Sequence, residues 1–263
     1  GGVLTPTHLG VLASIGCTEV SIFPPLKVGV VSTGDELVEG EVPLQPGQIR
    51  DSNRHSLLAL LNDLGLEGVD LGLIPDEEEA IEEVFRSACS GESRCDVVIS
   101  SGGVSMGDFD FVKVVLDRLG DMRWMQVAIK PAKPLAFGLV ENVPVFGLPG
   151  NPVSSIVSFE LFVRPALRKM MGHTDIWSSK IKAVAESPIS RRPDEKTHFA
   201  RVKVSLADGG YKVQSAGGQG SHQLSAMAEA NALAVLPDGN GVESGDVVEI
   251  ILLHQLTRDL NAS

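Results

Sequence analysis

The sequence predicts an α/β domain built on a doubly wound, mostly parallel sheet, followed by a small all-β unit. From residue 27 to residue 172, short apolar runs alternate with amphipathic helical patterns, which is typical of crossover connections between parallel strands. After Gly172, apolar and polar residues alternate and turn residues divide the segments, which favours a small barrel or sandwich. A chain of 263 residues is long enough for both units.

Apolar runs in the α/β part predict its strands. Each run is rich in aliphatic residues and is bounded by Gly, Pro or Asp, as expected for strands that are buried on both faces. The two extended segments before the last run suggest that part of the sheet is antiparallel. In order, the runs are "KVGVVST" (27–33), "GVDLGLI" (68–74), "CDVVIS" (95–100), "MRWMQVAI" (122–129), "PLAFGLV" (134–140) and "VPVFGL" (143–148).

Helical patterns lie between these runs. In the first pattern, leucines recur on one face, Ser52 or Asn53 is placed to cap the start, and Gly65 is placed to end the helix. Asp76 is placed to cap the second helix. The predicted helices span 52–65, 77–89, 109–120 and 151–172, the last with Asn151 as its cap and Pro152 at its first position.

The C-terminal part contains strand patterns and one short helical pattern, "SHQLSAMAEA" (221–230). The strand patterns are "SKIKAVAESPIS", "HFARVKVSLADGGYKVQSA", "NALAVLPDG" and "GDVVEIILL". Residues 1–25 have too little apolar surface to form a unit alone. We therefore expect a remnant of a preceding domain at 1–25, an α/β domain at 26–172 and a β domain at 177–263.

Composition excludes some classes of function. The formal charge of −12 makes the chain a poor general binder of nucleic acid. No stretch resembles a signal peptide or a membrane span. Cys17, Cys89 and Cys95 are odd in number and lack metal-ligand spacing, so they fit a reducing compartment. We expect a cytoplasmic protein that binds anions only locally.

Chemically versatile residues follow the predicted strands. Ligands of open α/β sheets bind at the carboxyl ends of the strands. Free N–H groups of glycine loops that lead into helices bind anions, and carboxylates beside phosphates suit Mg²⁺. Two lysines in "IKPAKP", held between prolines, could hold an oxyanion. The strand-end segments are Thr33 to Glu36, Asp76, "SSGGVSMGDFD" (100–110) and "LPGNPVSS" (148–155).

Each of these features also has a structural interpretation. Asp76 and Asp108 could serve only as helix caps, Asn151-Pro152 is an ordinary helix start, and the lysines could be solvated surface residues. Their convergence on one edge favours a binding site. A side chain added at Gly103 should then enter the ligand's space and leave the packing of strand and helix intact.

Five motifs, in this order and spacing, resemble the molybdopterin molybdenumtransferases, which are the bacterial MoeA proteins and their eukaryotic relatives, including the E domain of gephyrin. The motifs are "STGDEL", "GQIRDSN", "DVVISSGGVSMGDFD", "IKPAKP" and "GLPGNPVSS". The resemblance implies a MogA-like molybdopterin-binding fold for 26–172, the family's C-terminal β domain for 177–263, and the end of its preceding domain for "GGVLTPTHLGVLASIG". Ala132 stands where the family usually has glycine, and Gln126 stands where relatives often have a basic residue.

The resemblance also implies a reaction. Members of the family combine adenylylated molybdopterin with molybdate to form molybdenum cofactor and release AMP in a Mg²⁺-dependent step. Matching positions assign Mg²⁺ to Glu36, Asp76 and Asp110, which count as catalytic together with Lys130 and Lys133. Molybdate is assigned to Lys130, Lys133, Pro134, Ser154, Arg201 and Ser221, the last two as weaker matches. The pterin ligand is assigned to Thr33, Gly34, Ser101, Gly102, Gly103, Ser105, Gly107, Asp108, Gly150, Asn151, Pro152 and Ser154.

The family further implies a homodimer with additional N-terminal segments, a molybdopterin adenylyltransferase that acts beforehand, and molybdoenzymes that receive the cofactor. The chain is therefore expected to be part of a longer protein. Two alternatives stay open: an adenylyltransferase or nucleotide pyrophosphatase of the same fold, and a non-catalytic scaffold. Pyrophosphatases of that type usually carry "GGLGPT" and lack the β domain, and no receptor-binding linker is visible in this sequence.

Overall fold

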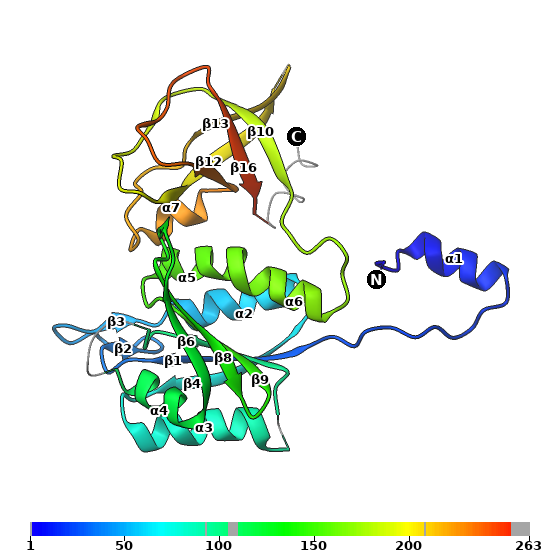
Figure 1. Cartoon of the computed structure of the whole chain (residues 1–263), viewed down its shortest axis with the longest axis vertical. Helices are drawn as coiled ribbons and strands as arrows, with labels where there is room; N and C mark the ends of the chain where they lie inside the picture. The colour runs from blue at the N-terminus through cyan, green and yellow to red at the C-terminus, as the bar shows by residue number, and fades with distance from the viewer. Residues whose placement is uncertain (1, 93, 105–109, 208, 254–263) are drawn as a thin grey trace.

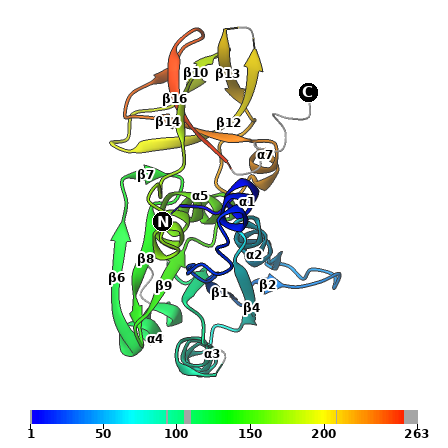
Figure 2. The ribbon, with the colours of Figure 1, turned by 90° about the vertical axis from the view of Figure 1, so that its right-hand side faces the viewer.

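A computed structural model describes residues 2–92, 94–104, 110–207 and 209–253. An α/β lobe lies below a β lobe in Figure 1, and a helix near the N-terminus stands off to one side. The view in Figure 2 shows the same stacking of the two lobes from the side. Among the described residues, no helix combines the length and the apolar character that crossing a membrane requires.

The α/β lobe is built on a six-stranded sheet, in the order β4 (Glu67–Ile74), β1 (Lys27–Thr33), β5 (Val97–Ser101), β9 (Val143–Leu148), β8 (Pro134–Val140) and β6 (Gly120–Gln126). β1 pairs in parallel with β4 and β5, and β5 pairs in parallel with β9. β8 runs antiparallel to both β9 and β6, as the extended segments in the sequence predict. A two-stranded ribbon of β2 (Leu37–Val38) and β3 (Ile49–Arg50) extends from the end of β1 (Figure 1).

One face of the sheet is covered by α2 (Asn53–Asp63), α5 (Pro152–Ser158), the π-helix η1 (Phe159–Val163) and α6 (Arg164–Met170). The leucine face predicted for α2 is confirmed, because Leu57 and Leu61 are fully buried against Val28 and Val30 of β1. Full burial of one leucine side chain stabilises the fold by about 2 kcal/mol. The leucine face therefore fixes α2 on this side of the sheet.

The opposite face is covered by α3 (Glu78–Ser90) and α4 (Phe111–Leu119). Ile81 and Phe85 of α3 and Val112 of α4 pack there against Val31 and Val98 of the sheet. Because side chains alternate along a strand, β1 supplies residues to both cores. The lobe is therefore a mixed α/β structure with helices on both faces of its sheet (Figure 1).

Several predicted helix caps are wrong in detail. α3 has Glu77 at its N-cap position instead of Asp76, and Asp110 is the residue whose carboxylate accepts from the N–H of Lys113 at the start of α4. Asn151 stands at the N-cap position of α5 and Pro152 follows at its start, as predicted, but the Asn151 side chain makes no capping bond. Gly65 follows the end of α2 with φ of 71°, as its prediction as a stop residue requires.

The β lobe is a small barrel. Its strands are β10 (Lys180–Ala185), β12 (Thr197–Ala207), β13 (Gly210–Ser215), β14 (Ala232–Leu236) and β16 (Val247–Leu252), with a side ribbon of β11 (Ile189–Ser190) and β15 (Gly241–Val242). β13 pairs with both β10 and β12, and β16 and β14 complete the ring of pairings. The predicted short helix is α7 (Leu224–Ala228).

The two lobes share a sheet and a core. β7 (Ile129–Lys130), which belongs to the α/β part of the sequence, pairs in parallel with β12 of the barrel. A buried cluster joins residues of both lobes, among them Val153 and Val157 of α5 and Met227 of α7. The barrel is therefore held against the amino end of α5.

The N-terminal helix α1 (Pro6–Ser14) is different in character. Thr5 caps it through its side chain, yet none of its residues is buried. Val3, Leu9, Ile15 and Phe23 in this segment are all exposed. α1 therefore contributes no buried residue to either core.

Candidate functional site

The predicted ligand-binding segments meet at one edge of the main sheet. β1, β5 and β9 end there, and because β8 is antiparallel to β9, the lysine loop before β8 lies at the same edge. Gly102 donates its N–H to the carbonyl of Leu148 at 3.1 Å. A Cβ atom at Gly150 would lie 3.8 Å from the Cα of Gly102. The glycine loops after β5 and β9 are therefore neighbours.

The two glycines after β5 have left-handed backbones, with φ of 95° at Gly102 and 68° at Gly103. A Cβ at Gly102 would lie 2.8 Å from the carbonyl oxygen of Thr33, and one at Gly103 would lie 2.3 Å from Cγ2 of Val112. Val112 belongs to the core under α4. The expectation that a side chain at Gly103 would leave the packing intact is wrong, since it would enter the core. Ser105, Gly107 and Asp108 lie outside the described residues.

Carboxylates gather beside these loops. Burial raises the pKa of Asp76, and the charges of Asp35, Glu36 and Asp110 raise it further. The side chain of Glu36 folds back over Gly34, where a Cβ would lie 2.6 Å from Oε2. The backbone N–H of Asp76 donates to Asp35 Oδ1 at 3.1 Å. The predicted metal residues therefore share one electrostatic environment with Asp35, which the sequence placed at the same strand end.

These carboxylates do not form a complete metal site by themselves. Among the residues that the structure describes, no group of three or more His, Cys, Asp or Glu side chains is arranged to hold a metal ion. Mg²⁺ commonly binds through one or two carboxylates together with substrate phosphates and water. The oxygen-only donor set fits that mode of binding, in which the ligand's phosphates supply the remaining oxygens.

The lysine loop is fixed by its neighbours. Val127 donates its N–H to the carbonyl of Lys133 at 2.7 Å, and Lys130 lies opposite His198 where β7 meets β12. Both lysine side chains are exposed. Ala132 has φ of 77°, a conformation that glycine adopts more easily, and its methyl group is buried between the lobes. Glycine, the residue that the resemblance predicts at this position, would adopt this backbone conformation at lower cost.

A backbone hydrogen bond joins the barrel to the start of α5, directly after the second glycine loop. Val153, near the start of α5, donates its N–H to the carbonyl of Ser221 at 3.1 Å. Ser154, the next residue of α5, is buried. The structure therefore brings the predicted molybdate residues Ser154 and Ser221, which are far apart in sequence, to the same place.

Arg201 lies on β12 and is fully buried. Its Nη2 donates to the carbonyls of Gly218 at 2.6 Å and Gly220 at 3.2 Å, whereas Nε and Nη1 have no hydrogen-bond partner. Burial lowers the pKa of Arg201. A guanidinium with two buried, unpaired nitrogens is costly, and an anion would offset that cost.

The segment "DSNR" holds this edge together, although sequence reasoning assigned it no role in the site. The amide nitrogen of Asn53 donates to Ser101 Oγ at 2.8 Å and to the carbonyl of Gly150 at 2.7 Å. Asp51 accepts from the Ser32 hydroxyl at 3.2 Å and pairs with Arg54 at 3.0 Å. Asp51 and Asn53 lie in the motif "GQIRDSN", and this motif was the signal in the sequence from which their role could have been found.

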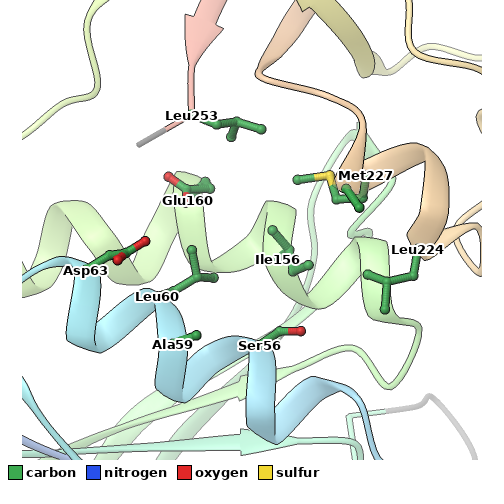
Figure 3. Close-up of a pocket in the computed structure, with 10 residues that line it drawn as sticks. Ser56, Ala59, Leu60, Asp63, Ile156, Glu160, Leu224, Met227 and Leu253 are labelled. Carbon is green, nitrogen blue, oxygen red and sulfur yellow. The ribbon is translucent and has the colours of Figure 1, made fainter. Parts of the chain in front are cut away.

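A separate cavity of about 320 Å³ lies between the lobes. As Figure 3 shows, side chains of α2 and α5 face those of α7 and Leu253 across it. Of its acidic residues, Glu160 is already paired with Arg164, with Nε and Oε2 2.6 Å apart. None of the predicted site residues lines it, so it is not the candidate site. Its lining is Ser56, Ala59, Leu60, Asp63, Ile156, Glu160, Leu224, Met227, Ala228 and Leu253.

The fold and site define a molybdopterin-binding α/β domain joined to a barrel. Residues 29–169 match the family described as "Probable molybdopterin binding domain", and residues 182–253 match "MoeA C-terminal region (domain IV)". The chain therefore belongs to the MoeA family, as the motifs in its sequence predict.

Two curated relatives share the name molybdopterin molybdenumtransferase. Molybdopterin molybdenumtransferase of Haemophilus influenzae is 44% identical over 256 residues, which are 95% of this chain and 62% of that protein. The enzyme of the same name from a Nostoc species is 36% identical over 95% of this chain and 58% of its own length. The chain thus spans about three fifths of the length of these relatives.

Solved structures agree with this assignment. A molybdopterin biosynthesis MoeA protein from Pyrococcus horikoshii superposes with a TM-score of 0.76 at 29% identity, over 95% of this chain and 60% of the other. A molybdenum cofactor biosynthesis protein from Pyrococcus furiosus superposes with a TM-score of 0.69 at 27% identity, over 95% of this chain and 76% of the other.

Proposed function

We propose that this chain is part of a molybdenum insertase. The enzyme binds adenylylated molybdopterin and molybdate, cleaves the phosphoanhydride to release AMP, and forms molybdenum cofactor. The observation that carries the proposal is the convergence of two glycine loops, a carboxylate cluster and a lysine loop at one sheet edge. It is supported by relatives that are named molybdopterin molybdenumtransferases.

In this proposal the glycine loops bind the ligand's phosphates. Backbone N–H groups of the loops after β5 and β9 would bind a phosphate, whose negative charge would offset their partial positive charge. The close contacts at Gly102 and Gly103 fix the shape of the first loop. Thr33 and Gly34 at the end of β1 form the neighbouring wall of the same site.

Glu36, Asp76 and Asp110 would hold Mg²⁺ together with the phosphates of the ligand. A bound Mg²⁺ neutralises phosphate charge during cleavage of the phosphoanhydride. Burial raises the pKa of Asp76 and the mutual repulsion of the carboxylates raises it further, and that repulsion would fall when a cation binds. Asp110 contributes from the start of α4, where its carboxylate also caps the helix.

Molybdate is a tetrahedral dianion and would bind between the lobes. Lys130 and Lys133 supply positive charge from the stiff loop that includes Pro134. Ser154 on α5 and Ser221 on the barrel supply hydroxyl groups near the contact that joins the lobes. Arg201 supplies two nitrogens without a protein partner. An anion reaches them only if the glycine-rich segment around Gly218 moves, because the guanidinium is enclosed.

The proposal extends to the cellular setting. We infer a cytoplasmic homodimer that receives adenylylated molybdopterin from a molybdopterin adenylyltransferase and passes its product to molybdoenzymes. A second copy would cover exposed apolar residues such as Leu9 of α1 and Ile15 directly after it.

The experiment that tests the function is direct. Full-length protein that contains this chain is mixed with adenylylated molybdopterin, molybdate and Mg²⁺, and AMP and molybdenum cofactor are measured. An insertase produces both, and the yield depends on molybdate and Mg²⁺. A pyrophosphatase releases AMP without cofactor, an adenylyltransferase adds the adenylyl group to free molybdopterin, and a scaffold binds neither molybdopterin nor molybdate.

A further inference from the structure

The segment 217–223, which we call the anion loop, connects β13 to α7 and contacts both lobes. Through the carbonyl of Ser221 it accepts the N–H of Val153 from α5. Through the carbonyls of Gly218 and Gly220 it accepts from the Arg201 guanidinium. The position of this loop therefore determines where Ser221 lies relative to α5 and to Arg201.

One side chain in the loop holds Arg201 by its backbone. The side-chain oxygen of Gln219 accepts the N–H of Arg201 at 2.9 Å, and its nitrogen donates to the carbonyl of Arg201 at 3.0 Å. The same nitrogen lies 3.1 Å from the carbonyl of Gly217. Gln219 thus binds both backbone groups of Arg201 and closes the loop on itself.

The sheet explains why this bond is needed. β12 pairs with β13 from Ala207 back to Val202, whose partner is Ser215. Arg201 is the next residue of β12, beyond the last rung of that ladder. Its backbone N–H is buried and would otherwise have no partner on this side, a situation that proteins avoid. The carbonyl of Arg201 accepts the N–H of Ala216 at 3.0 Å as well as the Gln219 amide, whereas the N–H of Arg201 has the Gln219 side-chain oxygen as its partner.

The loop is packed closely around this arrangement. A Cβ at Gly218 would lie 2.1 Å from the side-chain oxygen of Gln223, and that oxygen accepts the N–H of Gly220 at 3.1 Å. Two glutamine side chains therefore hold the glycine-rich loop, together with the bonds from Arg201 and Val153. Loss of either amide removes bonds that the glycines cannot replace, because glycine is the most flexible residue.

We propose that Gln219 is a positioning residue for oxyanion binding: it holds Arg201 and the anion loop so that the guanidinium and Ser221 meet a tetrahedral dianion. This proposal rests on the proposed function, which makes molybdate that dianion. Gln219 need not touch the anion. Its effect passes through the backbone of Arg201 and through the loop that carries Ser221.

The test compares three variants of the full-length protein. Gln219→Leu removes both amide bonds, and Gln219→Glu keeps an acceptor for the Arg201 N–H but loses the donor and adds a negative charge near the guanidinium. Gln214→Leu is the matched control, because it makes the same substitution at an exposed glutamine on the neighbouring strand β13. Molybdate and adenylylated molybdopterin are titrated separately by calorimetry, and each variant's thermal melting is recorded.

We expect Gln219→Leu to raise the Kd for molybdate about tenfold, because the variant loses the hydrogen bonds that position Arg201. Its Kd for adenylylated molybdopterin should change less than about twofold. Gln219→Glu should weaken molybdate binding at least as much while melting closer to the wild type. Gln214→Leu should match the wild type in both affinities.

Two results would overturn the proposal. The first is a folded Gln219 variant that binds molybdate with the affinity of the wild type. The second is an equal loss of affinity for molybdate and for adenylylated molybdopterin, which would indicate a purely structural role for Gln219. If Gln219→Leu fails to fold, Gln219→Glu decides between these outcomes. Wild-type protein that binds no molybdate would overturn the proposed function and this proposal together, so the two failures are distinguishable.

Discussion

Replacing Gly103 by valine perturbs the loop after β5 in two ways that the structure separates. The backbone at Gly103 has φ of 68°, which a β-branched residue adopts at a cost of about 1–3 kcal/mol. The new side chain would also meet Val112, whose Cγ2 lies 2.3 Å from the Cβ position. Overpacking of this kind costs about 1–3 kcal/mol more.

The sum is about 2–6 kcal/mol, a large part of the roughly 5–15 kcal/mol that stabilises a typical domain. We therefore expect the melting temperature to fall by about 10 °C, with ligand binding lost as the loop and α4 are displaced. The assay is thermal unfolding, followed by titration of adenylylated molybdopterin at a temperature where the variant is still folded.

A matched control isolates the clash from the backbone strain. Gly40 has a similar φ of 65° but open space around its Cβ position, so Gly40→Val should cost only the backbone term. Shortening Val112 to alanine should recover about 1 kcal/mol in the Gly103→Ala background, since residues in contact couple by about that amount. If Gly103→Val had the same melting temperature as Gly40→Val, the packing argument would be wrong.

The remaining predictions concern charges at the sheet edge. Asp76→Asn should raise the melting temperature at pH 7, because the folded-state pKa of Asp76 lies above its usual 3.8 and ionisation therefore destabilises the fold. The gain should vanish as the pH falls below 3.8, where the carboxyl is protonated in both states; a gain that persisted there would contradict the argument. Glu36→Gln and Asp110→Asn should lower Mg²⁺-dependent AMP release while leaving the fold intact, and normal turnover at limiting Mg²⁺ would exclude a ligand role. Lys133→Ala should weaken molybdate binding more than pterin binding in paired titrations; equal loss of both would indicate a collapsed loop.

Much of the fold is visible in the sequence because it depends on local patterns. The apolar runs place β1, β4, β5 and β9, and the leucine face of α2 predicts which side of that helix is buried. The end of α2 at Gly65 is also a local property, since glycine adopts a left-handed backbone at low cost. The antiparallel β8 was also predictable, because two extended segments follow each other without a crossover helix.

The candidate site could be predicted only as a set of segments. The carboxyl ends of parallel strands meet at one edge, so the sequence was enough to bring Glu36, Asp76 and the glycine loops together. It did not show that Asp110 is the cap of α4 while Glu77 stands at the start of α3. Helix starts are set by where the preceding strand releases the chain, so α3 has Glu77 at its N-cap position although the neighbouring aspartate is the better capping residue.

Tertiary contacts decided the rest. The sequence by itself determined that Gly103 must be small, but only the packing of α4 shows that Val112, and not a ligand, occupies the space beside it. In the same way, the sequence contains Arg201 and Gln219 as two polar residues 18 positions apart. Only closure of the barrel buries the arginine and brings its backbone N–H, just beyond the paired residues of β13, to the glutamine amide. Such pairings depend on which distant segments meet, because a buried polar group takes whichever partner the fold brings within hydrogen-bonding distance.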